Sequence, residues 1–330
     1  MELQNFTPVP AILWRTIVDD DRMAAAVVAR ITYRIVDGRL LLDSAQDWPI
    51  DKAEYDSPAG LRPPEDCFYR GGVDLIVLGS ARAPRGQPAP KVEVRVYLDD
   101  AAGYSFVSGV DVYGERLWTR SFGGELVATA PRPFVECELS MANAFGGVQT
   151  WDQLPVPHVS NPEGKGYYTE AAAALEQPLA NIEDPRRPVQ RWSDHPDPVG
   201  VGFCPPQFGP KATRNTVLDE RGVITKIEPS FFNEAFPDLV APPPPPHARC
   251  QVYGVREQGA VGFRLPTPPL VARVRLGDKT VVRELAYDQI GVEPDLDRVF
   301  ITYRYPFRYT VERMQARSCE LHWSPRAHEG

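Results

Sequence analysis

Several features that identify common protein classes are missing from this sequence. No run of apolar residues approaches the ~20 needed to cross a bilayer. The first residues have neither a basic start nor an unbroken apolar segment before a cleavage site, so we expect no signal peptide. The sequence has no His-Glu-x-x-His motif, no Cys-x-x-Cys pair, no phosphate loop ending in Gly-Lys-Ser/Thr and no Gly-x-Ser-x-Gly turn. It therefore gives no support for the zinc, nucleotide or hydrolase sites that these motifs build.

Paired cysteines and an excess of basic residues are missing as well. The five cysteines are odd in number, far apart and outside any short motif: Cys67, Cys137, Cys204, Cys250 and Cys319. This pattern is typical of reduced thiols, so we expect a cytoplasmic protein. The net charge is −8, with basic side chains dispersed among acidic ones. Because phosphate neutralisation needs clustered basic residues, we expect no nucleic-acid partner. We also expect no membrane partner, no cofactor and no metal.

Proline is the most unusual component that is present. The chain has 35 prolines in 330 residues, about twice the usual ~5% share, which favours turns and fixed loops over long helices. Hydrophobic residues make up 43% and charged residues 24%, enough for a sizeable core and too balanced for wholesale disorder. We predict a mainly β fold with antiparallel, sandwich-like sheets, long ordered loops rich in glycine, proline and aromatic residues, and a few short helices.

Residues 1–142 are predicted to form an N-terminal β domain. Val27–Val36 alternates apolar residues with polar ones such as Arg30, the pattern of a half-buried strand. Asp37-Gly38 follows and signals a two-residue hairpin turn, with residues 39–42 as the returning strand. Further strands are predicted at 73–78, 91–98 and 104–112, the last pairing with 115–119 across Tyr113-Gly114.

Residues 143–250, called the signature region below, carry few strand signals and are predicted to pack on the β core. Thr169–Gln177 is a short helix candidate, with Thr169 as its N-cap and Pro178 at its end. Ser230–Phe236 is predicted to form one further helical turn. The rest of this region is predicted to be mostly loop, and loops of this length are normally functional or disordered. The many aromatic residues favour loops that are packed.

Residues 251–330 are predicted to complete the β fold with strands and a short helix. The run Pro242–Pro246 leads into them and predicts a stiff polyproline II linker; the alternative is a docking strip for an aromatic groove. Gly277-Asp278 predicts a hairpin turn. The predicted elements are strands at 261–265, 270–276, 279–285 and 299–305, the last ended by Pro306, and a short helix at 311–318.

Three local clusters could carry chemistry, and each has a plainer interpretation. His195 lies between Asp194 and Asp197, as a base oriented by a carboxylate would, yet the same residues are good turn formers. Asp19-Asp-Asp21 lacks the spaced ligands and bend glycine of a calcium loop, so a solvated loop is favoured. Glu293–Asp297 could chelate weakly or form a polar turn. A carbohydrate-active or other hydrolytic β-sandwich enzyme with a carboxylate pair stays an alternative, because such partners meet in space and not in sequence.

The signature region contains short elements that together resemble one family. They are Asn143–Gly147 (Asn-Ala-Phe-Gly-Gly), Asn161–Tyr168 (Asn-Pro-Glu-Gly-Lys-Gly-Tyr-Tyr), Asn181–Pro185 (Asn-Ile-Glu-Asp-Pro), Asp197–Phe203 and Phe231–Ala235. In these elements the chain resembles the bacterial domain-of-unknown-function family numbered two-one-six-nine, which is found beside type VI secretion genes. The resemblance covers most of the chain and is strongest in the signature region.

The resemblance implies a non-catalytic cytoplasmic adaptor or chaperone. Such a protein helps to load an effector toxin, or its PAAR-type tip domain, onto the VgrG spike, and it needs no cofactor. A rigid β scaffold that displays aromatic loops suits protein recognition. The hypothetical partner surface is Trp151, Tyr167, Tyr168, Trp192, Phe231 and Phe232, although for any one of these aromatics a small core that fixes the loops is the favoured interpretation. The signature turns, which we expect to set backbone geometry, are Phe145, Gly146, Gly147, Asn161, Pro162, Gly164 and Gly166.

One segment departs from the family pattern. Phe208-Gly-Pro-Lys211 stands where the family usually has Trp-x-Pro-Arg, and Asn215–Asp219 stands where it has Gly-Thr-Tyr-Asp. We therefore expect the surface built by residues 208–229 to be altered, and with it the choice of partner.

Overall fold

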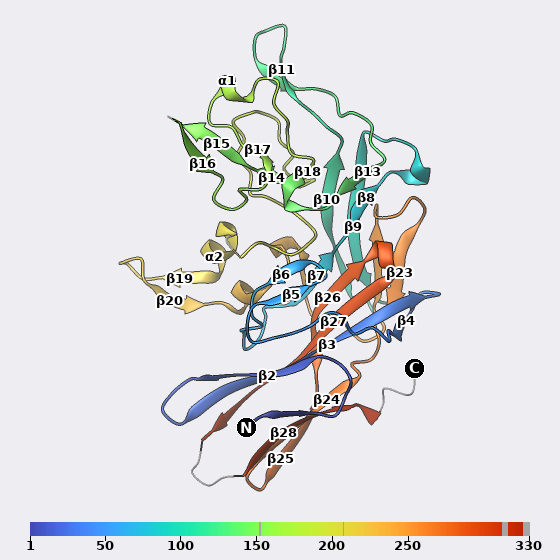
Figure 1. Ribbon diagram of the computed structural model, residues 1–330, viewed down its shortest axis with the longest axis vertical. Helices are drawn as coiled ribbons and strands as arrows, with labels where there is room; N and C mark the ends of the chain where they lie inside the picture. Colours follow the sequence, from blue (N-terminus) through green and yellow to red (C-terminus); the bar gives the residue numbers. More distant parts are fainter. Residues whose placement is uncertain (152, 207, 312–315, 326–330) are drawn as a thin grey trace.

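The computed structural model describes residues 1–151, 153–206, 208–311 and 316–325, and within them the chain is mainly β. Figure 1 shows an elongated molecule in which the large sheets occupy the middle. A four-stranded sheet lies at one end, and the loops, short strands and single helical turn between β11 and β18 lie at the other. Helix α2 and the β19–β20 hairpin project to one side.

A seven-stranded sheet forms the centre, in the order β2-β3-β27-β26-β7-β21 with β4 also paired to β3. All its pairings are antiparallel except that of β26 with β7. Its strands are β2 (Ala11–Ile17), β3 (Arg22–Val36), β4 (Arg39–Leu42), β7 (Val73–Val77), β21 (Val240–Ala241), β26 (Ala286–Glu293) and β27 (Arg298–Thr310). The sheet therefore takes strands from the first, middle and last parts of the chain, which share one fold.

A five-stranded antiparallel sheet, in the order β18-β10-β9-β22-β23, shares its core with the central sheet. Its strands are β9 (Lys91–Asp99), β10 (Ser105–Tyr113), β18 (Ile182–Glu183), β22 (Arg249–Tyr253) and β23 (Ala260–Arg264). Val94 and Val96 of β9 and Val27 and Ile31 of β3 belong to the same buried cluster. The predicted sandwich-like, mainly β arrangement is confirmed.

The four-stranded sheet has the order β1-β28-β24-β25, and short hairpins and bridges complete the fold. Its strands are β1 (Leu3–Asn5), β24 (Leu270–Leu276), β25 (Lys279–Glu284) and β28 (Arg317–Trp323). The two-stranded pairs are β5 (Tyr55–Ser57) with β6 (Gly60–Arg62), β8 (Ser80–Arg82) with β13 (Glu136–Glu138), β11 (Trp118–Arg120) with β12 (Leu126–Ala128), β14 (Phe145–Gly146) with β17 (Lys165–Gly166), β15 (Val148–Trp151) with β16 (Leu154–Pro157), and β19 (Thr216–Leu218) with β20 (Ile224–Ile227).

Helices are short, as the proline content predicts. The α-helices are α1 (Ala171–Ala174) and α2 (Gly209–Asn215). The 3-10 turns are η1 (Pro84–Gly86), η2 (Met141–Asn143), η3 (Pro229–Phe232), η4 (Pro237–Leu239) and η5 (Pro294–Leu296). The predicted helix at 169–177 is thus reduced to one turn, and its N-cap is Glu170 instead of Thr169. It stops early because Glu176 and Gln177 use their backbone groups to hydrogen-bond Trp118. The predicted turn at 230–236 is present, one residue earlier, and ends at Phe232.

Two hairpin predictions have opposite outcomes. Asp37 and Gly38 both have positive φ, 50° and 75°, and turn β3 into β4 as predicted. The pairing of 104–112 with 115–119 is wrong, because β10 pairs with β9 and β18. Gly114 is needed for close packing rather than for a turn, since a Cβ there would lie 1.7 Å from the carbonyl oxygen of Arg132.

Three predictions near the C-terminus or in β3 need correction. Strand β27 continues past Pro306. Beyond Arg304 it no longer pairs with β26, so Pro306, which has no N–H to donate, is tolerated on that unpaired edge. Arg317 and Ser318, placed in a helix, lie in β28, while 312–315 fall outside the described residues. The polar face of β3 is only partly solvated: Arg34 is exposed, but Arg30 is only 1% exposed.

Candidate functional site

The signature turns hold the middle of the chain in shape by backbone contacts. Asn161 donates from Nδ2 to the carbonyls of Met141 and Phe145, each over 2.9 Å. A Cβ on Gly164 would lie 2.3 Å from Asn161 Nδ2, and one on Gly146 would lie 2.1 Å from the Asn161 carbonyl oxygen. These contacts fix the backbone where the turns approach one another. Phe145 is buried, Pro162 is half-buried, and Gly147 and Gly166 have φ of 111° and 96°.

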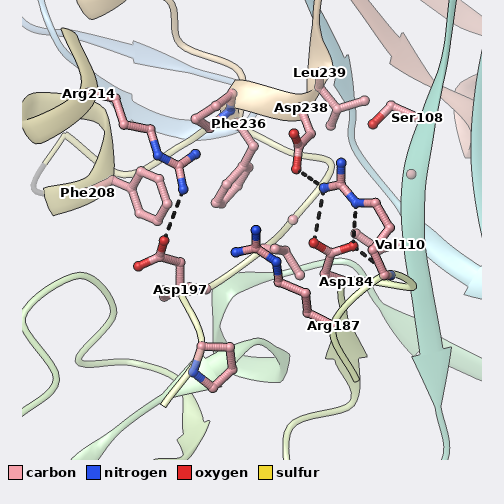
Figure 2. Close-up of a pocket in the computed structure, with 17 residues that line it drawn as sticks. Ser108, Val110, Asp184, Arg187, Asp197, Phe208, Arg214, Phe236, Asp238 and Leu239 are labelled. Carbon is pink, nitrogen blue, oxygen red and sulfur yellow. Dashed lines mark hydrogen bonds and ion pairs between the residues drawn. The ribbon is translucent and has the colours of Figure 1, made fainter. Parts of the chain in front are cut away.

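Two elements of the signature region meet β10 and α2 around a pocket of about 320 Å³ (Figure 2). One wall is the segment that follows β18, including Asp184 and Arg187, and another is the loop through Asp197. Phe208 and Phe236 supply the apolar side, and their rings pack edge to face with centroids 5.4 Å apart. We call this the arginine pocket.

Most charges in the arginine pocket neutralise one another. Arg186 pairs with Asp184 through two contacts of 3.0 Å and also with Asp238. Arg214 of α2 lies 3.3 Å from Asp197. Burial raises the pKa of Asp184, but the bonds from Arg186 outweigh it and hold that pKa below its ordinary value. Asp184 is therefore held ionised and cross-linked to Arg186.

A second pocket, of about 340 Å³, shares Phe208 with the arginine pocket. We call it the lysine pocket. Phe231 and Phe232 of η3 form its aromatic wall, and Lys211 of α2 reaches into it. It is also lined by Arg62, Pro63, Pro64, Asp66, Cys67, Arg70, Cys204, Pro206 and Glu234. The divergent element Phe208–Lys211 thus contributes Phe208 to both pockets and Lys211 to the second.

Lys211 has an unusual environment for a lysine. Its ammonium lies 6.0 Å from the centroid of the Phe231 ring. Within the described part of the chain it forms no ion pair, although Asp74 and Glu234 attract it from further away. Burial is the largest effect and lowers the pKa of Lys211 below its ordinary value. The pocket therefore holds a partly desolvated cation without a carboxylate in contact.

The floor of the lysine pocket is a buried network of charges. Arg70, with a side chain 2% exposed, contacts the carboxylates of Glu65, Asp74, Asp288 and Glu234. Glu234 also accepts a hydrogen bond from Arg62 over 2.8 Å and one from Gln289 over 3.1 Å. Because these partners satisfy Glu234, it is fixed in place beneath the pocket.

The network continues into the central sheet. Arg304 on β27 bonds Asp288 on β26, Glu65 and the carbonyl of Cys67. Arg30 on β3 donates to Thr302 Oγ1 over 2.9 Å, to Gln289 Oε1 over 3.1 Å and to the Pro49 carbonyl over 2.8 Å. From the signature region, Asn233 Nδ2 donates to Asp74 Oδ1 over 2.8 Å. The network therefore fastens η3 and its two phenylalanines to the sheet.

The six aromatic residues predicted to form a partner surface separate into groups. Phe231 and Phe232 line the lysine pocket and are half-buried. Tyr168 is only 5% exposed and packs with Trp118 and Leu179 in a small cluster. The hypothesis is therefore corrected for Tyr168, which belongs to the core that fixes the loops.

Of the remaining three, Trp192 and Tyr167 do not line the lysine pocket. Trp192 is half-buried against the Tyr168 cluster. Tyr167 is half-buried between His158 and His195, with ring centroids 5.2 Å from each. Trp151 ends β15, and its side chain lies outside the described part of the structure.

The three local clusters singled out for chemistry have structural roles. His195 bonds the Tyr168 carbonyl over 3.0 Å, while Asp194 Oδ2 accepts the backbone N–H groups of Gln190 and Arg191 in a turn. Asp19 pairs with Arg22 in the exposed loop between β2 and β3. Glu293 is buried and bonds Arg298 and the Trp48 indole.

No metal site or membrane helix is found in the ranges that the structure describes. No group of three or more His, Cys, Asp or Glu side chains is placed to hold a metal ion there. None of the helices in those ranges combines the length and apolar character that crossing a membrane requires.

The family relationship can now be stated. The model of the DUF2169 family, described as "Uncharacterized protein conserved in bacteria", matches residues 20–304. The chain belongs to this family. The match includes both pockets, α2 and most of the buried charge network. No curated protein and no solved structure matches the chain.

Sequence reasoning missed the most distinctive part of the site, the buried charge network. Arg70, Asp288 and Arg304 are up to 234 residues apart in the chain, so no local motif connects them. The only signal was Arg30 within a strongly apolar strand. Lys211 stands where the family pattern has arginine, but nothing in the sequence places it beside Phe231.

Proposed function

We propose that this chain is a non-catalytic adaptor that binds a type VI secretion effector, or its PAAR-type domain, and helps to load it onto the VgrG spike. The observation that supports this role is the pair of pockets that share Phe208 in their linings. Aromatic, proline and arginine side chains line them, which are residue types that anchor protein partners. The cytoplasm is the proposed location, since loading precedes secretion.

The rigidity of the site also favours binding a partner. The phenylalanines of η3 are attached through Asn233 and Glu234 to charged groups buried in the sheet. A preorganised surface loses less conformational entropy when a partner binds. Loops held in this way suit an adaptor that must recognise one protein among many.

The charges of the arginine pocket fit binding better than hydrolysis. A glycosidase needs one carboxylic acid that stays protonated near neutral pH. Here Asp184 and Asp238 are paired with Arg186, and Asp197 with Arg214. The pairing with Arg186 holds the pKa of Asp184 below its ordinary value, which is the opposite of what a general acid needs.

Capture from the native bacterium tests the proposal. The tagged chain would be purified from cells expressing the secretion system, together with Phe231→Ala and Phe122→Ala variants. Phe122 is a fully exposed phenylalanine outside both pockets and serves as the matched control. We expect an effector, PAAR or VgrG protein to co-purify with the wild type and with Phe122→Ala, and less with Phe231→Ala. Recovery of the chain alone, with secretion proteins present, would contradict the adaptor role.

A further inference from the structure

The lysine pocket contains a cation whose environment is incomplete. The other basic residues in the lining, Arg62 and Arg70, are in ion pairs with Glu234. In the described structure, Lys211 has the Phe231 ring at 6.0 Å and no carboxylate within ion-pair distance. Taking an ammonium partly out of water is unfavourable unless an opposite charge or hydrogen-bond acceptors replace the water. A ligand that brings an anion to Lys211 would supply what is missing.

We propose that the lysine pocket binds an acidic side chain, Asp or Glu, from an apolar segment of a partner protein, with its carboxylate on Lys211 and its neighbouring residues against Phe231 and Phe232. The volume of about 340 Å³ accommodates one or two side chains rather than a folded element. This inference names the chemistry recognised by the proposed adaptor, and it rests on that function only for the identity of the partner.

The other groups of the pocket favour a side-chain carboxylate over other anions. Capture of a chain's C-terminus relies on successive backbone N–H groups, and Pro63, Pro64 and Pro206 in the lining have none. Bidentate phosphate recognition uses arginine forks, and helix N-termini also bind phosphate, whereas a lysine contributes only a point charge. Here the arginines are already paired, and Asp66 and Glu234 would repel a dianion. A single lysine, a point charge above an aromatic wall, matches one monovalent carboxylate.

The turn between β19 and β20 offers a control for the test. Lys211 lines the lysine pocket, whereas Arg221 in this turn is exposed and lines neither pocket. Lys211→Met and Arg221→Met each remove one positive charge and keep an unbranched stem. A general loss of positive charge would therefore affect both variants alike.

The experiment pans a random heptapeptide library, displayed without free peptide C-termini, on the full chain and on both variants. We expect peptides containing Asp or Glu beside apolar residues to be enriched on the wild type and on Arg221→Met, and not on Lys211→Met. Exchanging the acidic residue of an enriched peptide for its amide should weaken binding about tenfold or more, as loss of a charge-assisted hydrogen bond does. Inorganic phosphate and a single-stranded oligonucleotide should not compete.

Several results would overturn the assignment. They are an absence of acidic enrichment on the wild type, equal enrichment on Lys211→Met, or displacement of the peptides by phosphate or oligonucleotide. Lys211→Met must keep the wild-type melting temperature for its loss of binding to count. If it melts lower, Lys211→Arg decides: the retained charge should restore acidic enrichment, and failure to do so counts against the proposal. Capture of secretion proteins by Lys211→Met at wild-type level would refute the anchor and leave the adaptor role standing.

Discussion

Arg304 donates two hydrogen bonds to Asp288, from Nε to Oδ1 over 2.9 Å and from Nη2 to Oδ2 over 3.0 Å. Both side chains are almost completely buried, 3% and 5% exposed. This two-pronged pair joins β27 to β26, and Arg70 approaches the same carboxylate from the loop before β7. Charges that are buried in this way depend on one another, because the loss of one leaves the others without compensation.

Replacing Asp288 by Asn should therefore strongly destabilise the protein. The change leaves Arg304 and Arg70 with less opposing charge in a buried site, so we expect the free energy of unfolding to fall by about 3–5 kcal/mol. Urea unfolding followed by circular dichroism would measure it. The exposed pair of Arg132 and Glu115, 72% and 57% exposed, is the control, and Arg132→Met should cost about 1 kcal/mol or less. Similar losses in the two variants would contradict a structural role for the network.

The pH dependence of stability should reveal Glu65. Burial raises the pKa of Glu65, but Arg70 and Arg304 lower it further, and it ends below its ordinary value of 4.5. The folded chain then binds this proton less readily than the unfolded chain, so Glu65 stabilises the fold above about pH 4.5. This stabilisation is lost as the pH falls through the lower folded pKa.

The test compares wild type with Glu65→Gln. We expect wild type to be more stable by about 3–5 kcal/mol at pH 7, and the difference to shrink as the pH falls below 4.5. Urea titrations at several pH values would measure the difference in unfolding free energy between the two proteins. The other titrating groups are common to both, so their contributions cancel to first order. A difference that stays constant down to pH 3 would contradict the assignment.

The signature glycines should tolerate no side chain. In Gly164→Ala the new Cβ would meet the Ala144 carbonyl oxygen at 2.6 Å as well as Asn161 Nδ2 at 2.3 Å. We expect a loss of about 1–3 kcal/mol from overpacking, measured as a lower melting temperature. At Gly123 the nearest atom would be 3.8 Å away, so Gly123→Ala is the control and should be close to neutral. Equal stability of both variants would disprove the packing argument.

Local patterns predicted the parts of the fold that depend on neighbours in the chain. The alternation in β9 and the Asp37-Gly38 turn succeed because side-chain period and turn geometry are local properties. The helix at 169–177 is shortened because Trp118 takes up the backbone groups of Glu176 and Gln177. That pairing crosses almost sixty residues and leaves no trace in the helix sequence itself.

In the candidate site, too, the sequence predicted local features and missed those that depend on distant contacts. The signature glycines and Asn161 could be recognised as turn formers because their role is set by the local backbone. The sequence could not show that Phe231 lines a pocket while Tyr168 is buried, because both are aromatic residues in loops. Only the fold places one in a pocket and the other among Trp118 and Leu179.

These two aromatics should respond differently to truncation. Tyr168→Ala removes a buried ring whose hydroxyl donates to the Pro178 carbonyl over 2.6 Å, so we expect stability to fall by about 3–5 kcal/mol. Phe231→Ala empties part of a pocket wall and should change the melting temperature much less while weakening partner capture. Thermal unfolding and pull-down of the same preparations would separate the effects. A larger stability loss for Phe231→Ala would place it in the core instead.

Lys211 should lower the stability of the free protein, because its ammonium has no opposite charge beside it until an anion binds. Because burial lowers its pKa in the folded state, the unfolded chain holds this proton more tightly. The protonated lysine therefore costs stability at pH 7, and the cost fades as the pH rises through the lowered folded pKa towards the ordinary value of 10.5. We expect Lys211→Met to unfold at the same or a higher urea concentration than wild type at pH 7, with the gap closing by about pH 10. A bound acidic peptide should reverse the order at pH 7, since binding adds to the stability of the form that binds. Destabilisation of Lys211→Met without peptide would mean that the ammonium is already satisfied within the fold.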